Sequence, residues 1–391
     1  MVIFEEAIQT VLSNTKILST EKIRFTDSLG FTLAENIYSD TDMPPFDKSS
    51  MDGYACKFSD IKNELEILEI IPAGKLPNKS VGRNQCSKIM TGAIVPQGAD
   101  CVIMIEQTEM ISENTIRFLK ESTFKNISYR GEDIKKGNVI IEKGTFIKPQ
   151  HIALMSSVGC TNPLVYKKPI VAIIATGSEL VEPDMIPASS QIRNSNAYQL
   201  CAQVNRIGAI PKYIGIAGDS EEETDRLFKL ALIDCNVVLI TGGVSAGDFD
   251  FVPKILKENN VNIIFEKVKI KPGKPTVFGI HEKCLVFGLP GNPVASYILF
   301  EVMVKQSLRK MMGNIEDFSE YEFPIGIDFK RNKADRLAWI PARLDENSEI
   351  IPVDYNGSAH LHSLNFADFV FPINIGVFEI IKGEKVKVKQ I

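Results

Sequence analysis

Residues 237–250, Val-Val-Leu-Ile-Thr-Gly-Gly-Val-Ser-Ala-Gly-Asp-Phe-Asp, contain the pattern that decides the fold of this chain. The stretch opens with four apolar residues, which is typical of a buried strand. Gly242, Gly243 and Gly247 then predict a loop, and the apolar spacing from Phe251 onward predicts a helix directly after it. A strand, a glycine loop and a helix in this order can hold a phosphate at the helix N-terminus. A plain structural turn explains this segment equally well when it is taken alone.

Two carboxylates, Asp248 and Asp250, close the same stretch. An acid beside a phosphate needs a cation between the two negative charges. Asp250 therefore indicates a site for a divalent metal ion.

Alternating strand and helix patterns surround this stretch, from Pro169 to Gly313. The alternation predicts a mostly parallel sheet covered by helices on both faces. Ligands of such sheets bind at the carboxyl ends of the strands. Four predicted loops follow strands and are expected to meet at that edge: 176–180, 218–219, 241–250 and 288–293.

The remainder of the chain has a different pattern of predicted secondary structure. Helical spacing predicts short helices over 4–14, 28–37 and 149–158. Short apolar runs separated by turn signals predict a β-rich segment between residues 55 and 147. Short strands return after about residue 314 and predict a small β-domain at the C-terminal end.

The composition excludes several classes of protein. The 391 residues are 44% hydrophobic and 24% charged, as expected for a globular chain with a sizeable core. The net charge is −5 and there is no basic run, so nucleic acid is not expected as a partner. No apolar stretch is long enough for a bilayer, and the N-terminus has no signal-peptide pattern, so no membrane partner is expected. Seven scattered cysteines indicate a reducing, cytoplasmic location.

Acids and lysines are concentrated in the strand-following loops and in the segment 267–275. They are Glu179, Asp219, Asp248, Asp250, Lys267, Lys269, Lys271 and Lys274, and the polar residue Asn292 accompanies them. Acids and lysines in one cleft suit phosphate-ester chemistry assisted by Mg²⁺. Solvated surface lysines are the alternative explanation. Neither a Walker A motif nor a spaced Gly-x-Gly-x-x-Gly is present, which disfavours P-loop kinases and NAD dehydrogenases.

Several further motifs carry a resemblance to a known family, and together with the opening loop they span nearly the whole chain in one order. They are Pro-Pro-Phe-Asp-Lys-Ser-Ser-Met-Asp-Gly-Tyr-Ala at 44–55, Ile-Met-Thr-Gly-Ala at 89–93, Arg-Gly-Glu-Asp at 130–133, Thr-Gly-Ser-Glu-Leu at 176–180, Ile-Lys-Pro-Gly-Lys-Pro at 270–275, Gly-Leu-Pro-Gly-Asn-Pro-Val at 288–294, and Gly357-Ser358 with Ser363. The sequence closely resembles the MoeA family, the molybdopterin molybdenumtransferases, to which the gephyrin E domain is also similar.

This resemblance implies an enzyme of molybdenum cofactor biosynthesis. Such an enzyme inserts molybdenum from molybdate into adenylylated molybdopterin and releases AMP and molybdenum cofactor, with Mg²⁺. The resemblance also implies a homodimer and a molybdopterin adenylyltransferase as substrate donor.

The fold class implied is multidomain α/β plus β, with a three-layer, MogA-like α/β domain built on a mostly parallel sheet. The expected domains are a segmented linker domain (1–43 and 138–168), an inserted β-rich domain (44–137), the MogA-like α/β domain (169–313) and a C-terminal β-barrel domain (314–391). The active site would lie between the α/β domain of one subunit and the β-rich domain of the other.

The resemblance further implies roles for residues at the matching positions. Expected catalytic residues are Asp52, Asp133, Glu179, Asp219 and Asp250, with Glu179 and Asp250 as metal ligands. Expected substrate-binding residues are Ser50, Thr91, Gly92, Thr176, Gly177, Gly242, Gly243, Ser245, Lys267, Lys271, Lys274, Pro290 and Pro293. One departure stands out: several relatives carry more arginines before the Arg-Gly-Glu-Asp turn, where this chain has Ser128 and Tyr129. A strong anion clamp is therefore not expected at Arg130.

Two other functions remain as alternatives. One is the sister activity, adenylylation of molybdopterin by a MogA-like protein, although that family lacks the N-terminal motifs and the C-terminal domain. The other is a scaffold that binds a receptor peptide, as the gephyrin E domain does. The presence of Asp52, Glu179, Asp219 and Asp250 together argues against a purely structural role.

Overall fold

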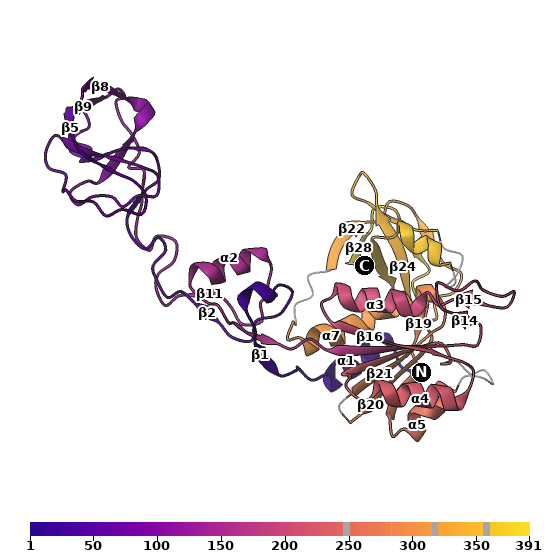
Figure 1. The fold of residues 1–391 in the computed structure, drawn as a ribbon. Helices are drawn as coiled ribbons and strands as arrows, with labels where there is room; N and C mark the ends of the chain where they lie inside the picture. The colour runs from indigo at the N-terminus through magenta and orange to yellow at the C-terminus, as the bar shows by residue number, and fades with distance from the viewer. Residues whose placement is uncertain (245–250, 283, 315–319, 355–359) are drawn as a thin grey trace.

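The chain has an elongated outline, seen here in a computed structural model that describes residues 1–244, 251–282, 284–314, 320–354 and 360–391 (Figure 1). A β-rich unit lies at one end, and an α/β sheet with a further β-sheet lies at the other (Figure 1). A narrow segment containing α2 (Pro149–Ser157) joins the two ends. Among the described residues, no helix has the length and hydropathy needed to cross a membrane.

The α/β region is built on a six-stranded sheet. Its order is β16 (Ile210–Ala217), β13 (Ile170–Thr176), β17 (Val237–Thr241), β21 (Cys284–Leu289), β20 (Pro275–His281) and β18 (Asn262–Lys267). The first four strands are mutually parallel, and the last two are antiparallel to their neighbours. The predicted parallel sheet is confirmed, with an antiparallel edge that the strand and helix alternation did not reveal.

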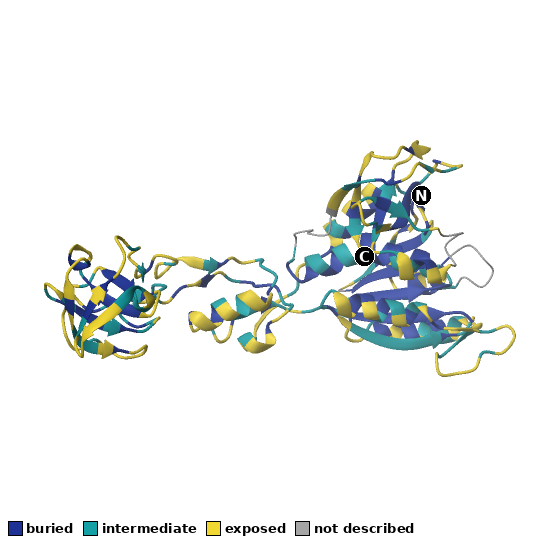
Figure 2. Ribbon diagram, turned by 90° about the horizontal axis from the view of Figure 1, so that it is seen from above, coloured by how far each residue is buried: buried dark blue, intermediate teal, exposed yellow. Residues whose placement is uncertain are grey.

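Alternating side chains of β13 enter two separate cores, which is why the strand reads as a continuous apolar run. Val171 and Ile173 pack with α1 (Phe4–Asn14), α3 (Asn196–Arg206) and α6 (Pro293–Leu299) on one face. Ala172 and Ile174 pack with α4 (Glu221–Ala231) and α5 (Val252–Glu258) on the other face. The sheet is thus buried between two helical layers (Figure 2).

Two helices of this region start at side-chain caps. The Ser220 hydroxyl accepts a hydrogen bond from the Glu223 N–H at 3.4 Å, as an N-cap does. The Glu223 carboxylate accepts from the Gly218 N–H at 2.8 Å. At the start of α3, the Asn194 side chain accepts from the Ala197 N–H at 3.2 Å. Both helices therefore begin directly behind loops that follow strands.

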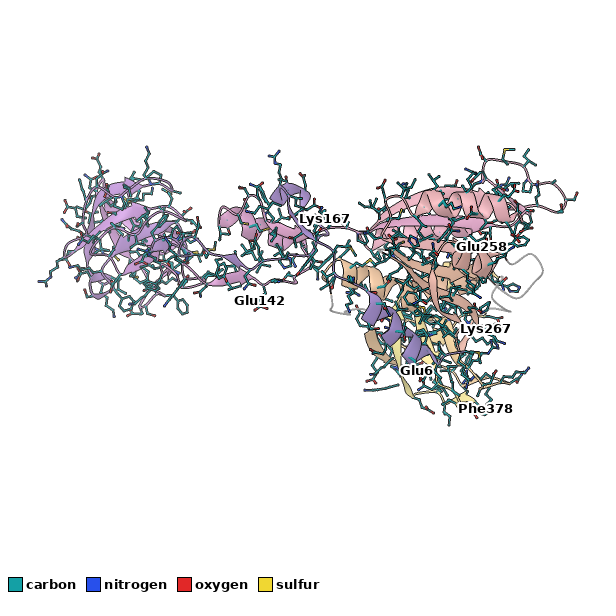
Figure 3. The ribbon with its side chains drawn as sticks, turned by 90° about the horizontal axis from the view of Figure 1, so that it is seen from below. Glu6, Glu142, Lys167, Glu258, Lys267 and Phe378 are labelled. Carbon is teal, nitrogen blue, oxygen red and sulfur yellow. The ribbon has the colours of Figure 1, made fainter. Side chains whose placement is uncertain are left out.

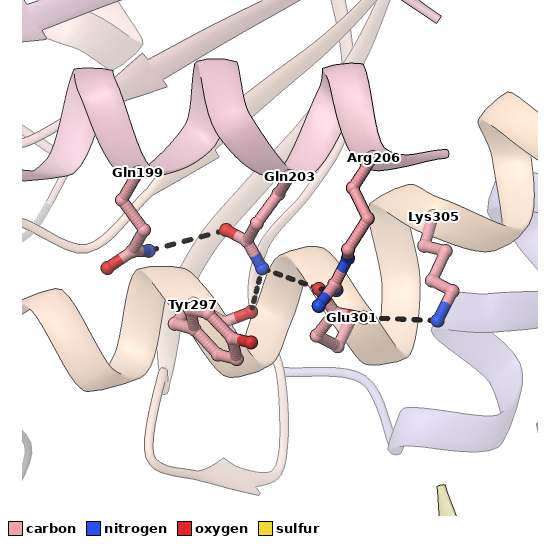
Figure 4. A network of polar contacts seen from close by, with 6 residues as sticks. All are labelled: Gln199, Gln203, Arg206, Tyr297, Glu301 and Lys305. Carbon is pink, nitrogen blue, oxygen red and sulfur yellow. Dashed lines mark hydrogen bonds and ion pairs between the residues drawn. The ribbon is translucent and has the colours of Figure 1, made fainter. Parts of the chain in front are cut away.

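The long helix that follows β21 consists of α6, a π-helical turn (Phe300–Val304) and α7 (Lys305–Met311) in succession. Glu301 lies in the π-helical turn and is 3% exposed. It accepts a hydrogen bond from Gln203 Nε2 at 2.6 Å and forms ion pairs with Arg206 and Lys305. This buried network fastens α3 to the long helix (Figure 4).

The β-rich unit contains a second six-stranded sheet. Its order is β7 (Cys101–Met104), β4 (Gly53–Cys56), β6 (Gln85–Ile89), β5 (Glu64–Ile71), β9 (Thr115–Phe118) and β8 (Thr108–Ser112). Its side chains pack in their own small cores, on both sides of β4. At Gly53 the strands β4 and β7 approach so closely that a Cβ would lie 2.0 Å from the Ile103 carbonyl oxygen.

Short strand pairs make up the segment between the two ends. They are β1 (Thr20–Lys22) with β12 (Leu164–Tyr166), β2 (Ile37–Tyr38) with β11 (Val139–Ile141), and β3 (Lys48–Ser49) with β10 (Ile127–Ser128). The helix predicted over 28–37 is wrong. Gly30 has φ +77°, and Leu33 forms a β-bridge with Val165 rather than stacking on its own helical turn. The apolar residues there serve pairing between distant segments, which a local pattern cannot distinguish from a helix.

The narrow segment meets the α/β region at a tight backbone contact. Gly313 lies against the Tyr166 ring, where a Cβ would come within 2.3 Å of a ring carbon. The Leu18 N–H donates to the Met311 carbonyl at 2.8 Å. Lys168 lies 4.0 Å above the Phe31 ring, and its neighbour Lys167 is labelled at this junction in Figure 3.

The C-terminal sheet has the order β19 (Ile270–Lys271), β24 (Leu337–Leu344), β26 (Phe369–Ile373), β28 (Lys385–Gln390) and β22 (Glu320–Pro324), with β25 (Ile350–Pro352) paired to β24. A separate pair joins β23 (Phe329–Lys330) to β27 (Glu379–Ile380). Closure into a barrel and the predicted domain boundaries stay predictions. The helix α1 packs with the α/β core and also touches this sheet through the Phe4 and Trp339 rings.

Candidate functional site

A cavity of about 630 Å³ lies at the carboxyl ends of β13, β17 and β21. This is the edge at which the sequence places ligand binding. Eight of the predicted site residues line this cavity: Thr176, Gly177, Glu179, Asp219, Gly242, Gly243, Pro290 and Pro293. The structure therefore brings together residues separated by more than a hundred positions in the chain.

The glycine turn after β17 forms the floor of the cavity. Gly242 has φ +95° and Gly243 has φ +61°, conformations that favour glycine. A Cβ on Gly242 would lie 2.5 Å from the Thr176 carbonyl oxygen, so the turn packs directly on the end of β13. The Gly242 N–H donates to the Leu289 carbonyl at 3.0 Å, which ties the turn to β21.

Two carboxylates stand on the exposed side of the same cavity. Asp219 and Ser178 exchange hydrogen bonds: the Ser178 N–H donates to the carboxylate at 3.2 Å, and the Asp219 N–H donates to the hydroxyl at 2.8 Å. The Glu179 carboxylate folds over Gly177, where a Cβ would lie 2.5 Å from its oxygen. Both side chains are exposed, so their oxygens are open to a ligand.

Within the described ranges, no three acidic, histidine or cysteine side chains form a metal-binding group. Asp250, the predicted partner of Glu179, and Ser245 lie outside the described residues. Glu179 and Asp219 do supply carboxylate oxygens on one cavity, which is the ligand type that Mg²⁺ prefers.

One wall of the cavity escaped the sequence reasoning. It runs from Ile192 to Asn196, between β15 (Ile192–Arg193) and the start of α3. Asn194 and Ser195 line this wall although no site role was predicted for them. The clustering of Asn, Ser and Asn before a helix was the available signal, because these residues offer hydrogen-bonding groups at a strand-to-helix junction.

Behind this wall, Asn194 is held by a partly buried polar cluster. Its Nδ2 donates to the Tyr213 hydroxyl oxygen at 3.0 Å. The Tyr213 and Tyr198 hydroxyls donate to opposite oxygens of Glu182, at 2.6 and 2.8 Å. Burial, followed by the bond to Glu182, raises the pKa of Tyr213, so this phenol stays protonated. The cluster fixes the wall rather than supplying an acid or base.

The predicted lysines do not line this cavity. Lys267, Lys271 and Lys274 are all exposed, around the turn between β18 and β20. Pro275, directly after Lys274, does line it. Lys267 is labelled at the α/β end of the molecule in Figure 3. The lysines therefore lie on an exposed loop next to a cavity wall, and their role stays a prediction.

The other predicted residues lie in and beside the β-rich unit. Thr91 donates twice to Asp52 Oδ1, from its N–H at 2.6 Å and from its hydroxyl at 2.8 Å. These bonds, the backbone one first, hold the pKa of Asp52 below its usual value. The Gly92 N–H donates to the Ser49 carbonyl at 2.8 Å, and the Ser50 and Ser128 hydroxyls are 3.0 Å apart. Asp133 lies at the turn below the unit, where its N–H donates to the Met43 carbonyl at 3.1 Å.

The Arg-Gly-Glu-Asp turn is held to the preceding segment by its own charges. Arg130 Nε donates to Asp42 at 2.6 Å, and the Asp42 carboxylate also accepts from the Lys136 N–H at 2.9 Å. The Lys136 bond and then the Arg130 bond lower the pKa of Asp42. Arg130 is thus engaged in an ion pair within the turn.

The two sets of site residues do not meet within one chain. The β-rich unit that carries Asp52 and Thr91 lies at the opposite end of the molecule from the α/β cavity (Figure 1). An acidic, glycine-lined cavity at the carboxyl edge of a largely parallel sheet defines an α/β enzyme suited to a phosphate-bearing ligand.

Comparison with known proteins identifies the family. Residues 2–159 match the model of the MoeA N-terminal region (domain I and II), and residues 172–310 match that of a probable molybdopterin binding domain. The molybdopterin molybdenumtransferase of Staphylococcus epidermidis is 36% identical over 375 residues, covering 93% of this chain and 89% of that protein. The enzyme of the same name from Bacillus subtilis is 36% identical over 371 residues, with 88% and 86% covered.

A solved structure agrees with these matches. The molybdopterin biosynthesis moeA protein of Pyrococcus horikoshii superimposes with a TM-score of 0.85, at 30% identity and with all of both chains covered. The chain belongs to the MoeA family, the molybdopterin molybdenumtransferases. The match to the MoeA N-terminal region also argues against the MogA-like adenylylating alternative, since those proteins lack that region.

Proposed function

We propose that the cavity at the carboxyl edge of the α/β sheet is where this molybdopterin molybdenumtransferase holds adenylylated molybdopterin while molybdenum from molybdate is inserted and AMP is released. One observation carries the proposal: the glycine turn at 242–243 and the exposed carboxylates of Glu179 and Asp219 line the same cavity. A nucleotide phosphate needs close backbone approach and a cation that offsets its charge. The glycine turn allows the approach, and the carboxylates can hold the cation.

Each predicted residue of the cavity has a distinct proposed role. Gly242, Gly243 and Ser245 cradle the nucleotide phosphate, with Thr176 and Gly177 shaping the opposite side. Pro290 and Pro293 stiffen the loop between β21 and α6. Lys267, Lys271 and Lys274, exposed beside Pro275, attract the molybdate oxyanion or the phosphate of the pterin.

The donor set fits Mg²⁺ better than a softer metal. Glu179 and Asp250 would hold the ion, with Asp219 beside them, and all three ligands are carboxylates. When bound, Mg²⁺ supplies positive charge that offsets the phosphate charge of the nucleotide. Asp219 is oriented by its hydrogen-bond exchange with Ser178, so its carboxylate is held toward the cavity independently of the ion.

The remaining proposed features follow from the family and from the separation of the two residue sets. The protein would be a cytoplasmic homodimer in which Ser50, Asp52, Thr91, Gly92 and Asp133 of one subunit face the cavity of the other. A molybdopterin adenylyltransferase would deliver the substrate. The domain boundaries would be those predicted, with α1 packed on the α/β domain and with the C-terminal strands closing into a barrel.

A molybdenum-insertion assay with purified adenylylated molybdopterin and molybdate tests the proposal. Glu179→Gln and Asp219→Asn keep the side-chain shape and remove the charge. We expect each to lower the rate of insertion by at least about a hundredfold, the range seen when a group stabilising developing charge is lost. Normal rates in both variants would show that this cavity is not the reaction site.

Glu258→Gln serves as the matched control, because this acid lies at the end of α5 and does not line the cavity. Its rate should equal that of the unmodified protein. Loss of activity in the control as well would point to a general effect of charge. If the protein consumed ATP to adenylylate molybdopterin, the sister activity would replace the one proposed.

A further inference from the structure

The end of strand β17 and the loop after β21 approach each other closely at the floor of the cavity. A Cβ built on Gly291 would lie 3.6 Å from the Gly242 Cα. Gly242 and Gly243 in one loop and Pro290 and Gly291 in the other offer no polar side chain that could hold the two loops together at this point. Their spacing sets the width of the site, so whatever holds them together also controls ligand fit.

Asn196, the first residue of α3, bridges both loops with one amide nitrogen. Its Nδ2 donates to the Thr241 hydroxyl at 3.0 Å and to the Gly291 carbonyl at 2.7 Å. The Thr241 hydroxyl, which is 2% exposed, donates in turn to the Pro290 carbonyl at 3.2 Å. These bonds, with the peptide link between Pro290 and Gly291, close a ring around the junction of helix, strand and loop.

The chemistry of this ring is specific to a carboxamide. A single short side chain must offer two N–H donors in different directions, which Asn does and Ser, Asp or Ala does not. The buried Thr241 hydroxyl has both a donor and an acceptor partner, so loss of Asn196 leaves it half-satisfied. The α3 helix that carries Asn196 is anchored separately, at its far end, by Gln203 and Arg206 on Glu301 (Figure 4).

We infer that Asn196 is a positioning residue that sets the distance between the Gly242 turn and the Gly291 loop, and thereby the fit of the nucleotide part of the substrate. The inference deepens the proposed function and rests on it for the identity of the ligand. It assigns to Asn196 a role carried out through Thr241 and Gly291 rather than through the ligand.

Calorimetric titration of the full-length protein with AMP and Mg²⁺ is the test of ligand fit. Asn196→Ala and Thr241→Val should each weaken AMP binding by about fivefold to tenfold, the equivalent of one lost hydrogen bond. Because both substitutions break the same ring, the double variant should weaken AMP binding by no more than about tenfold relative to the unmodified protein. Gln203→Met, at the other end of α3, should lower the melting temperature while leaving the affinity for AMP unchanged.

Amide hydrogen exchange gives a readout that needs no ligand. Exchange at Gly242, Gly243 and Gly291 should speed up in Asn196→Ala and stay unchanged in Gln203→Met. Unchanged exchange at these amides in Asn196→Ala would overturn the inference, as would additive losses of AMP affinity in the double variant. If the unmodified protein bound no AMP, the nucleotide site proposed above would fail, and the exchange data would still decide the role of Asn196.

Discussion

Thr91 holds one oxygen of Asp52 with two hydrogen bonds, from its backbone N–H at 2.6 Å and from its hydroxyl at 2.8 Å. The two residues are 39 positions apart and stand at the end of β6 and the start of β4, on neighbouring strands of the β-rich unit. The carboxylate is exposed, so the bonds orient it without burying it. Asp52 therefore presents an oriented, ionised carboxylate to solvent.

Thr91→Val should raise the pKa of Asp52 toward its ordinary value of 3.8, since one of the two bonds to the ionised form is lost. A carboxyl whose pKa is lowered in the folded state adds stability above the ordinary value, and this stability is lost as pH falls through the lowered pKa. The stability lost in Thr91→Val should therefore be constant above about pH 4 and should shrink as pH falls below that value. Carboxyl NMR titration of both proteins measures the pKa of Asp52.

Thr108→Val is the control for this titration. Thr108 lies in the same unit, and its hydroxyl donates to the Ile105 carbonyl. Its replacement should leave the Asp52 titration unmoved. An unchanged midpoint for Asp52 in Thr91→Val would show that the hydroxyl bond does not form in solution.

Complementation between inactive variants tests whether the site is shared between subunits. Asp52→Ala and Glu179→Ala should each lack molybdenum-insertion activity while remaining folded dimers. Subunit exchange of an equal mixture gives half heterodimers, each with one intact site, so about a quarter of the normal activity should return. If both residue sets acted within one chain, the mixture would stay inactive.

Gly242→Ala should be more costly than an ordinary left-handed glycine replacement. Gly242 and Gly383 have similar φ values, +95° and +90°, but only at Gly242 would a Cβ meet other atoms, 2.5 Å from the Thr176 oxygen. We expect about 1–2 kcal/mol of lost stability for Gly383→Ala from backbone strain. Gly242→Ala should lose about 1–3 kcal/mol more than this, because its Cβ also clashes with the Thr176 oxygen. Urea denaturation compares them, and equal losses would contradict the close packing of this turn.

Glu301→Ala should destabilise the α/β region strongly. The carboxylate is 3% exposed and is the partner of Gln203, Arg206 and Lys305. Removing one member of a buried charge network costs about 3–5 kcal/mol, because the other groups lose their partner. Thermal and urea denaturation measure the loss.

The exposed pair between Lys330 and Glu379 is the comparison for Glu301, with Lys330→Ala expected to leave the unfolding midpoint unchanged. The loss of stability in Glu301→Gln should lie between the losses in Glu301→Ala and Lys330→Ala. The amide keeps an oxygen for Gln203 but carries no charge. A small effect of Glu301→Ala would mean that water reaches the site and replaces the lost contacts.

Local patterns predicted the α/β region well because the sequence there obeys local rules. The run from Ile170 to Ala175 is apolar throughout since β13 is buried on both faces, and Ser220 with Glu223 caps α4 through contacts only a few residues apart. The helix expected over 28–37 failed for the opposite reason. Leu33 is buried against Val165, a partner 132 positions away, and local spacing carries no information about such pairing.

The candidate site was predicted where its residues form motifs and missed where they act through tertiary contacts. Glu179, Asp219 and the glycine turn belong to recognisable loops. Asn196 matters through Thr241 and Gly291, which lie 45 and 95 positions away. Its donors could be assigned to these partners only after the sheet order was known.

The contact between Gly313 and the Tyr166 ring has a mechanical consequence. It lies where the slender segment leaves the α/β body, so any bend at this pivot point would swing a long lever whose tip carries Asp52. Displacement at a tip grows with its distance from the pivot, so a slight tilt of the Tyr166 ring against the backbone moves Asp52 much farther than it moves Tyr166. The absence of a side chain at residue 313 permits this close contact, and a side chain there would shift the far end of the molecule more than the contact itself.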